Sequence, residues 1–337
     1  MVTLKDIARA CGVSRSTVSK AMNGYGDVSP ETAEQIRKKA EEMGYLPNLA
    51  ARSLKTNRTY SLGILFSDQL GSGLKHEYFT GILNSFKMEA EAAGYSITFL
   101  SDSLGGRRMT YLEQSRYRNF DGVMVACTDY EAPQLLELVK SELPVVTIDY
   151  SFSECTAVLS DNVKGMHDLM HYVFGRGHRD IAYIHGELTS VTKKRLASFY
   201  KCCGEFGVNP REDWIIQSRY RDAEACRELT KRLLAEKKRP TCILYPDDFA
   251  LIGGLNEILE QGLRIPEDIS VAGYDGSFLS GLLSPKLTTV RQDTDAIGRT
   301  AAKKLIAAVE APRIWLAEQI QIPGELIPGE SVGDLPV

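Results

Sequence analysis

The sequence has little of what marks an exported or membrane-bound protein. No stretch of its 337 residues approaches the run of about 18 apolar residues that a membrane helix needs. The opening residues, Met-Val-Thr-Leu-Lys-Asp, contain no hydrophobic segment of the kind that directs secretion. We therefore expect a cytoplasmic protein without a membrane partner.

Cysteine is also scarce, and its positions form no recognisable pattern. The seven cysteines are an odd number and show neither disulfide nor zinc-site spacing. The adjacent pair Cys202 and Cys203 lacks the two intervening residues of a redox motif. We interpret the cysteines as reduced, buried thiols of a protein in a reducing compartment.

No arrangement typical of an enzyme is found. Catalysis needs a convergent nucleophile, base and oxyanion donors, or a metal constellation. Among the five histidines, only His167 and His171 are four residues apart, and no glutamate follows the first as in a zinc hydrolase. We interpret this pair as surface or packing residues. Residues 71–73 lack the lysine of a phosphate-binding loop. We expect no catalytic residue, no bound metal and no cofactor.

The net charge of −4 taken alone argues against nucleic acid as a partner, but the charges are unevenly distributed. Residues 1–60 carry ten Lys and Arg against six Asp and Glu, whereas the remaining residues carry 30 against 38. Phosphate contacts supply most non-specific affinity for nucleic acid. A small basic head on an acidic body is therefore expected if only one segment contacts DNA.

Residues 1–46 are predicted to form three short helices. Thr3 and Asp6 have capping-box spacing and open a helix that ends near Gly12. Ser14 caps a second helix, and residues 29–31, Ser-Pro-Glu, open a third. Two short helices joined by a tight turn and braced by a third are typical of a helix-turn-helix domain, whose second helix enters the major groove of DNA.

The second helix has one face suited to DNA. Val18 and Met22 lie four residues apart and are expected to face inward. The exposed side then presents Arg15, Ser16, Ser19 and Lys20. These side chains can donate hydrogen bonds to guanine or to phosphate. The alternative is an ordinary solvated helix face. The start and stop signals of all three helices disfavour it.

Several motifs of this head resemble the lactose/galactose repressor (LacI/GalR) family of bacterial transcription regulators. They are TLKDIA at 3–8, GVS at 12–14, TVS at 17–19, NG at 23–24, GYLPN at 44–48 and ARSL at 51–54. The resemblance implies palindromic operator DNA as the partner. It also implies DNA contacts from Thr3, Ser14, Arg15, Ser16, Thr17, Ser19, Lys20, Asn23, Ala51, Leu54 and Lys55.

In that family, residues equivalent to 47–60 form a hinge helix and linker. The resemblance implies that Leu54 of each subunit wedges into the minor groove at the centre of the operator. An apolar wedge opens a base step at a cost of a few kcal/mol, which contacts in the bent complex offset. Because one short helix is marginal alone, two hinges must pack together on DNA. We therefore expect a homodimer, possibly a tetramer. A plain linker is the alternative.

From residue 61 onward, apolar runs alternate with amphipathic stretches. The apolar runs are 62–66, 97–100, 122–126 and 145–148, and then 181–184, 214–216, 242–245 and 269–272. Such alternation predicts parallel sheets covered by helices on both faces, and two successive sets predict two lobes. The fold class expected is α/β, a two-lobed periplasmic-binding-protein-like sensor over 61–337, preceded by the all-α head.

Acidic residues follow three of these apolar runs. They are Asp149, Asp247 with Asp248, and Asp275. Ligands of open parallel sheets bind beyond the carboxyl ends of strands, so these carboxylates could bind ligand hydroxyls. They could equally cap the helices that follow.

The family motifs continue through the sensor. They include SDN at 160–162, GHR at 177–179, RLA at 195–197, IPEDISVAGYD at 265–275 and LTTVRQ at 287–292. The resemblance implies lobes of about 61–155 plus 290–318 and 156–289 plus 319–337. It also implies an effector cleft lined by Phe79, Asp149, Arg195, Tyr220, Asp248 and Asp275.

Planar donors, carboxylates and an aromatic wall suit a sugar or sugar derivative. We therefore expect a repressor of carbohydrate-utilisation genes whose operator affinity is controlled by such an effector. Two departures affect the sensor only: a longer, polar entrance at 68–78, and Ser198 where glycine is common. The main alternative is a solute-binding protein of a sugar transporter, which the basic helical head disfavours.

Overall fold

The computed structural model describes residues 2–22, 25–45, 58–67, 73–101, 103–104 and 106–335. The chain forms two units, Met1–Thr59 and Tyr60–Val337. Each unit has its own hydrophobic core.

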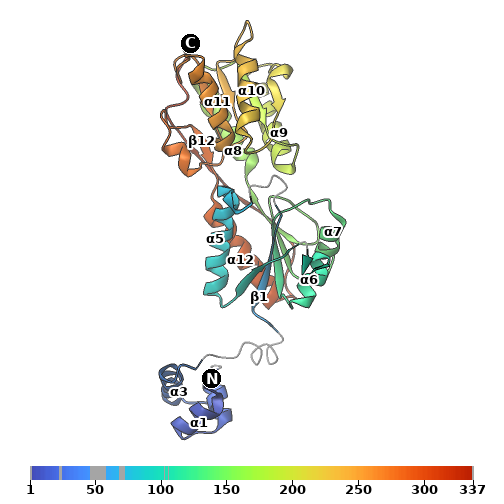
Figure 1. Ribbon diagram of the computed structural model, residues 1–337, viewed down its shortest axis with the longest axis vertical. Helices are drawn as coiled ribbons and strands as arrows, with labels where there is room; N and C mark the ends of the chain where they lie inside the picture. Colours follow the sequence, from blue (N-terminus) through green and yellow to red (C-terminus); the bar gives the residue numbers. More distant parts are fainter. Residues whose placement is uncertain are drawn as a thin grey trace. The chain divides into compact units, whose positions relative to one another are not determined.

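The first unit is all helical over its described residues. Its helices are α1 (Leu4–Cys11), α2 (Arg15–Met22) and α3 (Pro30–Glu42) (Figure 1). Ile7, Val18 and Ile36, one from each helix, are at most 1% exposed and form the centre of the core. The carboxylate of Asp6 accepts hydrogen bonds from the backbone N–H and the hydroxyl of Thr3. The three-helix prediction is confirmed.

The first lobe of the second unit is built on a parallel sheet. The strand order is β13–β7–β6–β5–β1–β2. The strands are β1 (Ser61–Phe66), β2 (Ser96–Phe99), β5 (Gly122–Cys127), β6 (Val145–Ile148), β7 (Thr156–Ser160) and β13 (Gln319–Ile322). Helices α5 (Glu77–Ala92) and α12 (Thr294–Glu310) pack against one face, and α6 (Tyr111–Tyr117) and α7 (Pro133–Val139) against the other (Figure 1).

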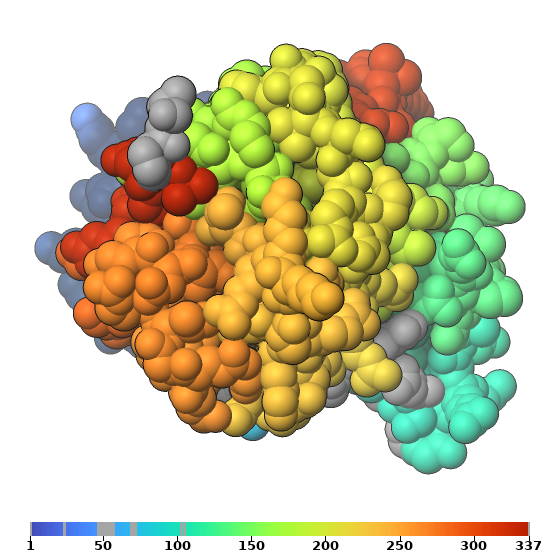
Figure 2. Space-filling model, turned by 90° about the horizontal axis from the view of Figure 1, so that it is seen from above, coloured from blue at the N-terminus to red at the C-terminus, as the bar shows by residue number. Residues whose placement is uncertain are grey.

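The second lobe repeats this arrangement on a smaller parallel sheet, in the order β11–β10–β8–β9. The strands are β8 (Ile181–His185), β9 (Ile215–Gln217), β10 (Cys242–Leu244) and β11 (Ser270–Ala272). Helices α8 (Asn162–Gly175) and α9 (Ser190–Glu205) cover one face, and α10 (Ala223–Leu234) and α11 (Asp248–Glu260) the other. The yellow and orange parts of the chain, which include α10 and α11, form an unbroken surface in Figure 2.

The smaller elements complete the second unit. They are the antiparallel pair β12 (Thr289–Arg291) and β14 (Glu325–Ile327), the short hairpin β3 (Ser103–Leu104) and β4 (Arg107–Arg108), and the 3-10 turns η1 (Gly73–Lys75), η2 (Glu212–Trp214) and η3 (Phe278–Gly281). The α/β two-lobed fold class expected from the alternating pattern is confirmed.

The boundaries between the lobes differ from those expected. The expected boundaries assigned residues 156 onward and 319 onward to the second lobe, but β7 and β13 are strands of the first sheet. Every residue of β7 is buried, and β7 pairs in parallel with β6 on one side and β13 on the other. The chain therefore leaves the first lobe after residue 160 and again after residue 322. β13 lies at the edge of the first sheet, and its alternation of glutamine and isoleucine suits a strand with one exposed face.

None of the helices in the described ranges combines the length and the apolar character that crossing a membrane requires.

Candidate functional site

The exposed face of α2 carries the cationic residues expected to contact DNA. Arg15 and Ser16 are exposed at its start, and Lys20 is exposed near its end. Lys20 forms an ion pair with Asp27, and this hydrogen bond lowers the pKa of the Asp27 carboxyl. Among the described residues, no ion pair is found for Arg15. Two cations of the expected set are thus exposed on α2, and one of them is paired with a carboxylate.

Three hydroxyl residues of the expected DNA-contacting set also stabilise the helix ends. Thr3 donates its hydroxyl to Asp6, and Ser14 Oγ accepts the N–H of Thr17 at 3.0 Å. Ser14 Oγ also lies 2.8 Å from the Thr17 hydroxyl. Because these hydroxyls are held locally, their orientation is set before DNA arrives. Asn23, Ala51, Leu54 and Lys55 lie outside the described residues.

In the second unit, Arg195 is the most firmly held of the expected effector residues. It lies on α9 and is 2% exposed. Its Nε donates to Asn162 Oδ1 at 2.7 Å, and its Nη1 donates to the carbonyl of Pro246 at 3.0 Å. The guanidinium carbon lies 3.5 Å from the centre of the Tyr274 ring. No hydrogen-bond partner is found for Nη2 among the described residues, so this group can donate to a ligand.

Asp149 follows β6 and has a left-handed backbone with φ of 57°. Its Oδ1 accepts the backbone N–H of Ser160 at 2.9 Å, and its Oδ2 accepts the hydroxyl of Tyr78. Burial raises the pKa of Asp149, against the effect of these hydrogen bonds. Burial and the neighbouring carboxylate raise the pKa of Tyr78 well above its ordinary value. Tyr78 therefore keeps its proton and donates it in the hydrogen bond to Asp149.

Asp275 follows β11 and also has a positive φ, of 104°. Its Oδ1 accepts Gln292 Nε2 at 2.7 Å. Burial raises the pKa of Asp275, and Arg195 opposes this rise. Burial also raises the pKa of Asp247, the residue before α11. Protonation or a neighbouring cation would therefore lower the free-energy cost of burying the Asp247 and Asp275 carboxylates.

The two acids after β10, Asp247 and Asp248, make different contacts. Asp247 caps α11 by accepting the N–H of Ala250 at 2.8 Å. Asp248 accepts the hydroxyl of Thr289 and the N–H of Ser277, each at 2.7 Å. Burial raises the pKa of Asp248 to about 7. Asp248, which was expected to bind effector, has both oxygens engaged within the second lobe.

A cavity of about 720 Å³ opens between the two lobes. Its walls include Glu77, Tyr78, Asn84, Arg221, Asp247, Asp248, Phe249, Asp275, Arg291 and Gln292. Of the expected residues it is lined by Asp248 and Asp275, whereas Asp149 is joined to it through Tyr78. A hydrogen bond of 2.7 Å from the N–H of Phe278 to the Glu77 carboxylate connects the lobes beside it.

The two expected aromatic residues are half-buried, and neither is on the cavity wall. Phe79 contacts the rings of Phe66 and His76, at 5.5 and 4.9 Å between centres, and packs on the first core. The Tyr220 hydroxyl lies 2.7 Å from that of Thr192, and its ring centre is 5.9 Å from the Arg195 guanidinium. Tyr220 is thus a second ring near the Arg195 guanidinium, further from it than Tyr274.

Sequence reasoning missed several residues of this region. Tyr78, Asn162 and Tyr274 contact the expected carboxylates or Arg195 directly, and Arg221 lies on the cavity wall. Asn162 and Tyr274 stand inside quoted motifs, next to residues that were considered. Nothing in the sequence distinguishes Arg221 from other surface arginines.

A helix-turn-helix unit followed by a two-lobed binding fold defines the chain as a ligand-responsive DNA-binding protein. Residues 3–48 match the family described as "Bacterial regulatory proteins, lacI family". Residues 170–332 match the "Periplasmic binding protein-like domain".

Curated relatives and solved structures match nearly end to end. The HTH-type transcriptional repressor PurR of Pectobacterium carotovorum subsp. carotovorum is 32% identical over 343 residues, covering 100% of this chain and 98% of the relative. PurR of Escherichia fergusonii gives the same identity and coverage. The lac repressor dimer bound to operator and the anti-inducer ONPF is 25% identical, with a TM-score of 0.77 over 98% of this chain and 99% of that one. The CelR–cellobiose complex is 25% identical, with a TM-score of 0.68 over 98% and 100%.

The chain therefore belongs to the lacI family of bacterial regulatory proteins. It is a DNA-binding transcriptional repressor of that family and not an enzyme. The recognition of this family from its sequence motifs is confirmed.

Proposed function

We propose that the chain represses carbohydrate-utilisation genes in the cytoplasm, binding a palindromic operator as a homodimer and responding to a sugar or sugar derivative between its lobes. The observation that carries the effector proposal is Arg195. Its guanidinium is fixed on Tyr274 and keeps Nη2 available beside the buried acid Asp275. Fixed donors next to carboxylate acceptors match the paired hydroxyls of a sugar ring.

The cavity supports an effector of this size. Its volume of about 720 Å³ falls within the range of roughly 300–1,000 Å³ typical of small-molecule sites. Tyr78 and Phe249 supply aromatic surface in its wall for the C–H faces of a sugar. The similar CelR structure holds cellobiose, and a further structure from this family, of Enterococcus faecium, holds ribose.

A purine effector is the second candidate. It is favoured by the curated relatives at 32% identity, which are named PurR, for purine synthesis repressor. A flat base could stack on an aromatic wall as a sugar does, but it offers fewer hydroxyls to the carboxylates. The two candidates therefore differ in how strongly they depend on acids such as Asp275.

A thermal-shift experiment on the full chain separates the candidates. Monosaccharides, disaccharides, purine bases and purine nucleosides would each be tested at a fixed concentration. Binding at a hundredfold excess over the Kd stabilises the folded state by about 2.7 kcal/mol, which shifts the Tm by roughly 5–10 °C. A shift with sugars that is lost in Asp275→Asn supports a sugar effector. A shift with purines alone would replace the sugar proposal by the purine one.

We infer that α2 presents the DNA-reading surface. Arg15 and Ser16 lie at the N-terminal end of this helix, which is the end that meets base edges in helix-turn-helix complexes. Two such helices in a two-fold dimer explain a palindromic operator. The hinge residues Ala51, Leu54 and Lys55 are proposed to add minor-groove contacts.

Effector and operator are proposed to act on one equilibrium between lobe arrangements. Hydrogen bonds join the lobes, from Ser190 Oγ to the carbonyl of Asp149 at 2.9 Å and from the N–H of Phe278 to Glu77 at 2.7 Å. A ligand held by both lobes favours the arrangement in which its contacts are complete. If only one arrangement lets the two hinges pair, the ligand changes operator affinity.

Operator binding is tested with labelled duplexes selected for affinity from a random library. The expected result is a palindromic sequence bound by two chains, with affinity that changes when effector is added. Fluorescence anisotropy gives the affinity, and sedimentation gives the stoichiometry. One chain per duplex, or selection of a sequence without two-fold symmetry, would contradict the dimer.

A further inference from the structure

Four potential metal ligands meet between two helices of the second lobe, and none of them lines the cavity. His167 and His171 lie on α8, and Cys202 and Glu205 lie on α9. One ligand atom of each lies within 4.8 Å of those of the other three. Imidazole, thiol and carboxylate groups thus converge from two helices on one point.

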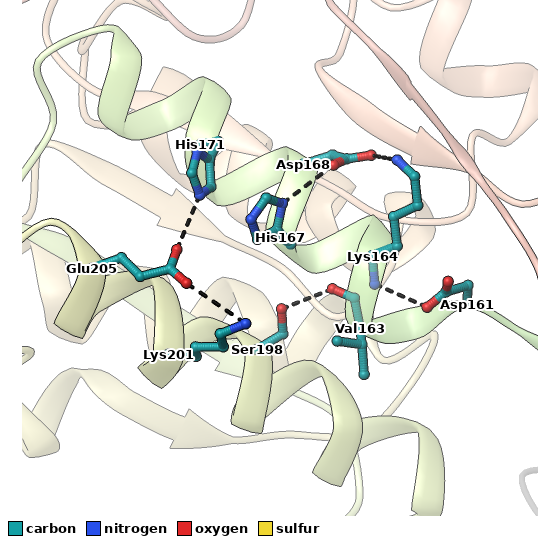
Figure 3. A network of polar contacts seen from close by, with 9 residues as sticks. All are labelled: Asp161, Val163, Lys164, His167, Asp168, His171, Ser198, Lys201 and Glu205. Carbon is teal, nitrogen blue, oxygen red and sulfur yellow. Dashed lines mark hydrogen bonds and ion pairs between the residues drawn. The ribbon is translucent and has the colours of Figure 1, made fainter.

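The spacing along each helix explains this convergence. Side chains three or four residues apart lie on the same helix face. The two imidazole rings stack with centres 4.0 Å apart, and His171 Nε2 lies 3.2 Å from Glu205 Oε2. Figure 3 shows His171 and Glu205 facing each other across the gap between the helices. Cys202 is buried at the base of the group, and the other three are partly open to solvent.

We propose that His167, His171, Cys202 and Glu205 bind a divalent transition-metal ion of the Zn²⁺ class. Two imidazoles, a thiolate and a carboxylate suit Zn²⁺ or Co²⁺, whereas Mg²⁺ and Ca²⁺ prefer oxygen ligands alone. Tetrahedral Zn²⁺ places its ligand atoms roughly 3.3–3.7 Å apart, given bonds of about 2.0–2.3 Å. Side-chain movements of about 1 Å therefore complete the site.

The group around the first histidine orients it for this role. His167 Nδ1 lies 3.3 Å from Asp168 Oδ1, which leaves Nε2 for the metal. Asp168 is paired in turn with Lys164 (Figure 3). A carboxylate that receives the second ring proton of a histidine ligand is the usual partner of such a ligand in zinc sites. Asp168 is therefore a positioning residue for the proposed ion.

One cation already competes for the site. Lys201 Nζ lies 3.7 Å from Glu205 Oε1, with its side chain 68% exposed. A metal ion would take over the Glu205 carboxylate, and Lys201 can turn into solvent. Cys202 would bind as the thiolate, with its proton released to water.

The ion would link α8 to α9. A hydrogen bond of 2.8 Å from Ser198 Oγ to the carbonyl of Val163 already joins these helices, and Arg195 on α9 bonds to Asn162 on α8. The proposed site needs neither DNA nor effector and does not rest on the proposed function.

The test is metal binding to the full chain after treatment with a chelator. Calorimetry with Zn²⁺ is expected to give one ion per chain and to raise the Tm, whereas Mg²⁺ gives neither. Co²⁺ is expected to show thiolate-to-metal charge-transfer absorption and the ligand-field bands of a tetrahedral ion. Cys202→Ser should abolish the charge-transfer band and weaken Zn²⁺ binding about 100-fold or more. Asp168→Asn should weaken it about tenfold.

Two variants make the test specific. Cys203→Ser removes the adjacent buried thiol, which is outside the group, and should leave both the band and the affinity unchanged. Lys201→Gln removes the competing cation and should tighten binding about two- to fivefold. The proposal is overturned if Zn²⁺ does not bind, if the charge-transfer band persists in Cys202→Ser, or if His171→Gln binds Zn²⁺ as tightly as the unaltered chain.

Discussion

Arg195→Ala separates effector binding from DNA binding. The substitution removes the hydrogen bonds to Asn162 and Pro246 and the contact with Tyr274. An unsatisfied buried acceptor costs about 1–3 kcal/mol, and water entering from the neighbouring cleft reduces that cost. We expect a loss of about 2–4 kcal/mol in the free energy of unfolding, which corresponds to roughly 4–12 °C in Tm.

The effect on the effector is expected to be larger than the loss of one contact. In the proposed complex Nη2 supplies a charged hydrogen bond worth about 1.5–3 kcal/mol, and its removal also leaves Asp275 without its neutralising cation. Effector affinity should fall about 100-fold or more, since each 1.4 kcal/mol is a factor of ten. Operator affinity without effector should change less than about threefold, because Arg195 is buried in the second lobe.

The matched control is Arg211→Ala. Arg211 also covers an aromatic ring, with its guanidinium carbon 4.2 Å from the centre of the Trp214 ring, but it pairs with Asp213 and Glu236, whereas Arg195 acts on Asp275 of the cavity wall. Effector affinity and operator affinity would be measured by calorimetry and anisotropy at a temperature where all variants are folded. An equal loss of both affinities in Arg195→Ala would refute the proposed separation.

Three further predictions concern the head, the hinge and the core. Arg15→Ala should lower the salt dependence of operator binding by about one phosphate contact per subunit, seen as a shallower slope of log affinity against log salt, with effector binding unchanged. Leu54→Ala should reduce the ratio of specific to non-specific DNA affinity about tenfold or more, and an unchanged ratio would count against a wedge. Gly253→Ala should destabilise by about 3 kcal/mol in urea, because its Cβ would overlap the carbonyl of Ala223, whereas Gly204→Ala, with open space around it, should stabilise by about 0.5–1 kcal/mol.

The features predictable from the sequence are those determined by nearest neighbours along the chain. Helix starts in the head follow from hydroxyl residues such as Thr3 and Ser29 placed before apolar residues at helical spacing. The alternation of strands and helices was likewise visible as apolar runs. The lobe boundaries could not be predicted in this way. The alternating pattern of β13 is compatible with an edge strand of any sheet, and only its pairing with β7 assigns it to the first sheet.

The contacts of the cleft depend on residues far apart in the chain, which limits sequence reasoning. Arg195 was found through its motif, but its partner Asn162 is 33 residues away and Pro246 is 51 away. Asp248 was expected to bind effector because of the family resemblance, and it does lie on the cavity wall. Its contact with Thr289, 41 residues further on, whose hydroxyl donates to it, could not be predicted from the sequence. Among the four proposed metal ligands, the sequence analysis singled out His167 and His171 but interpreted them as surface or packing residues. It did not connect them with Cys202 and Glu205, since α8 and α9 are joined by a strand and a loop.

The backbone at the cleft gives an independent argument that its acids are placed for binding. Asp149 and Asp275 both have positive φ values, which cost a non-glycine residue about 1–2 kcal/mol. Each follows a buried strand, and burial raises the pKa of each carboxyl. Backbone strain and burial of a carboxylate therefore coincide at the same two residues, and both carboxylates interact electrostatically with Arg195. Asparagine or glycine would be less costly at such turns, and this favours the proposed role of both carboxylates in effector binding.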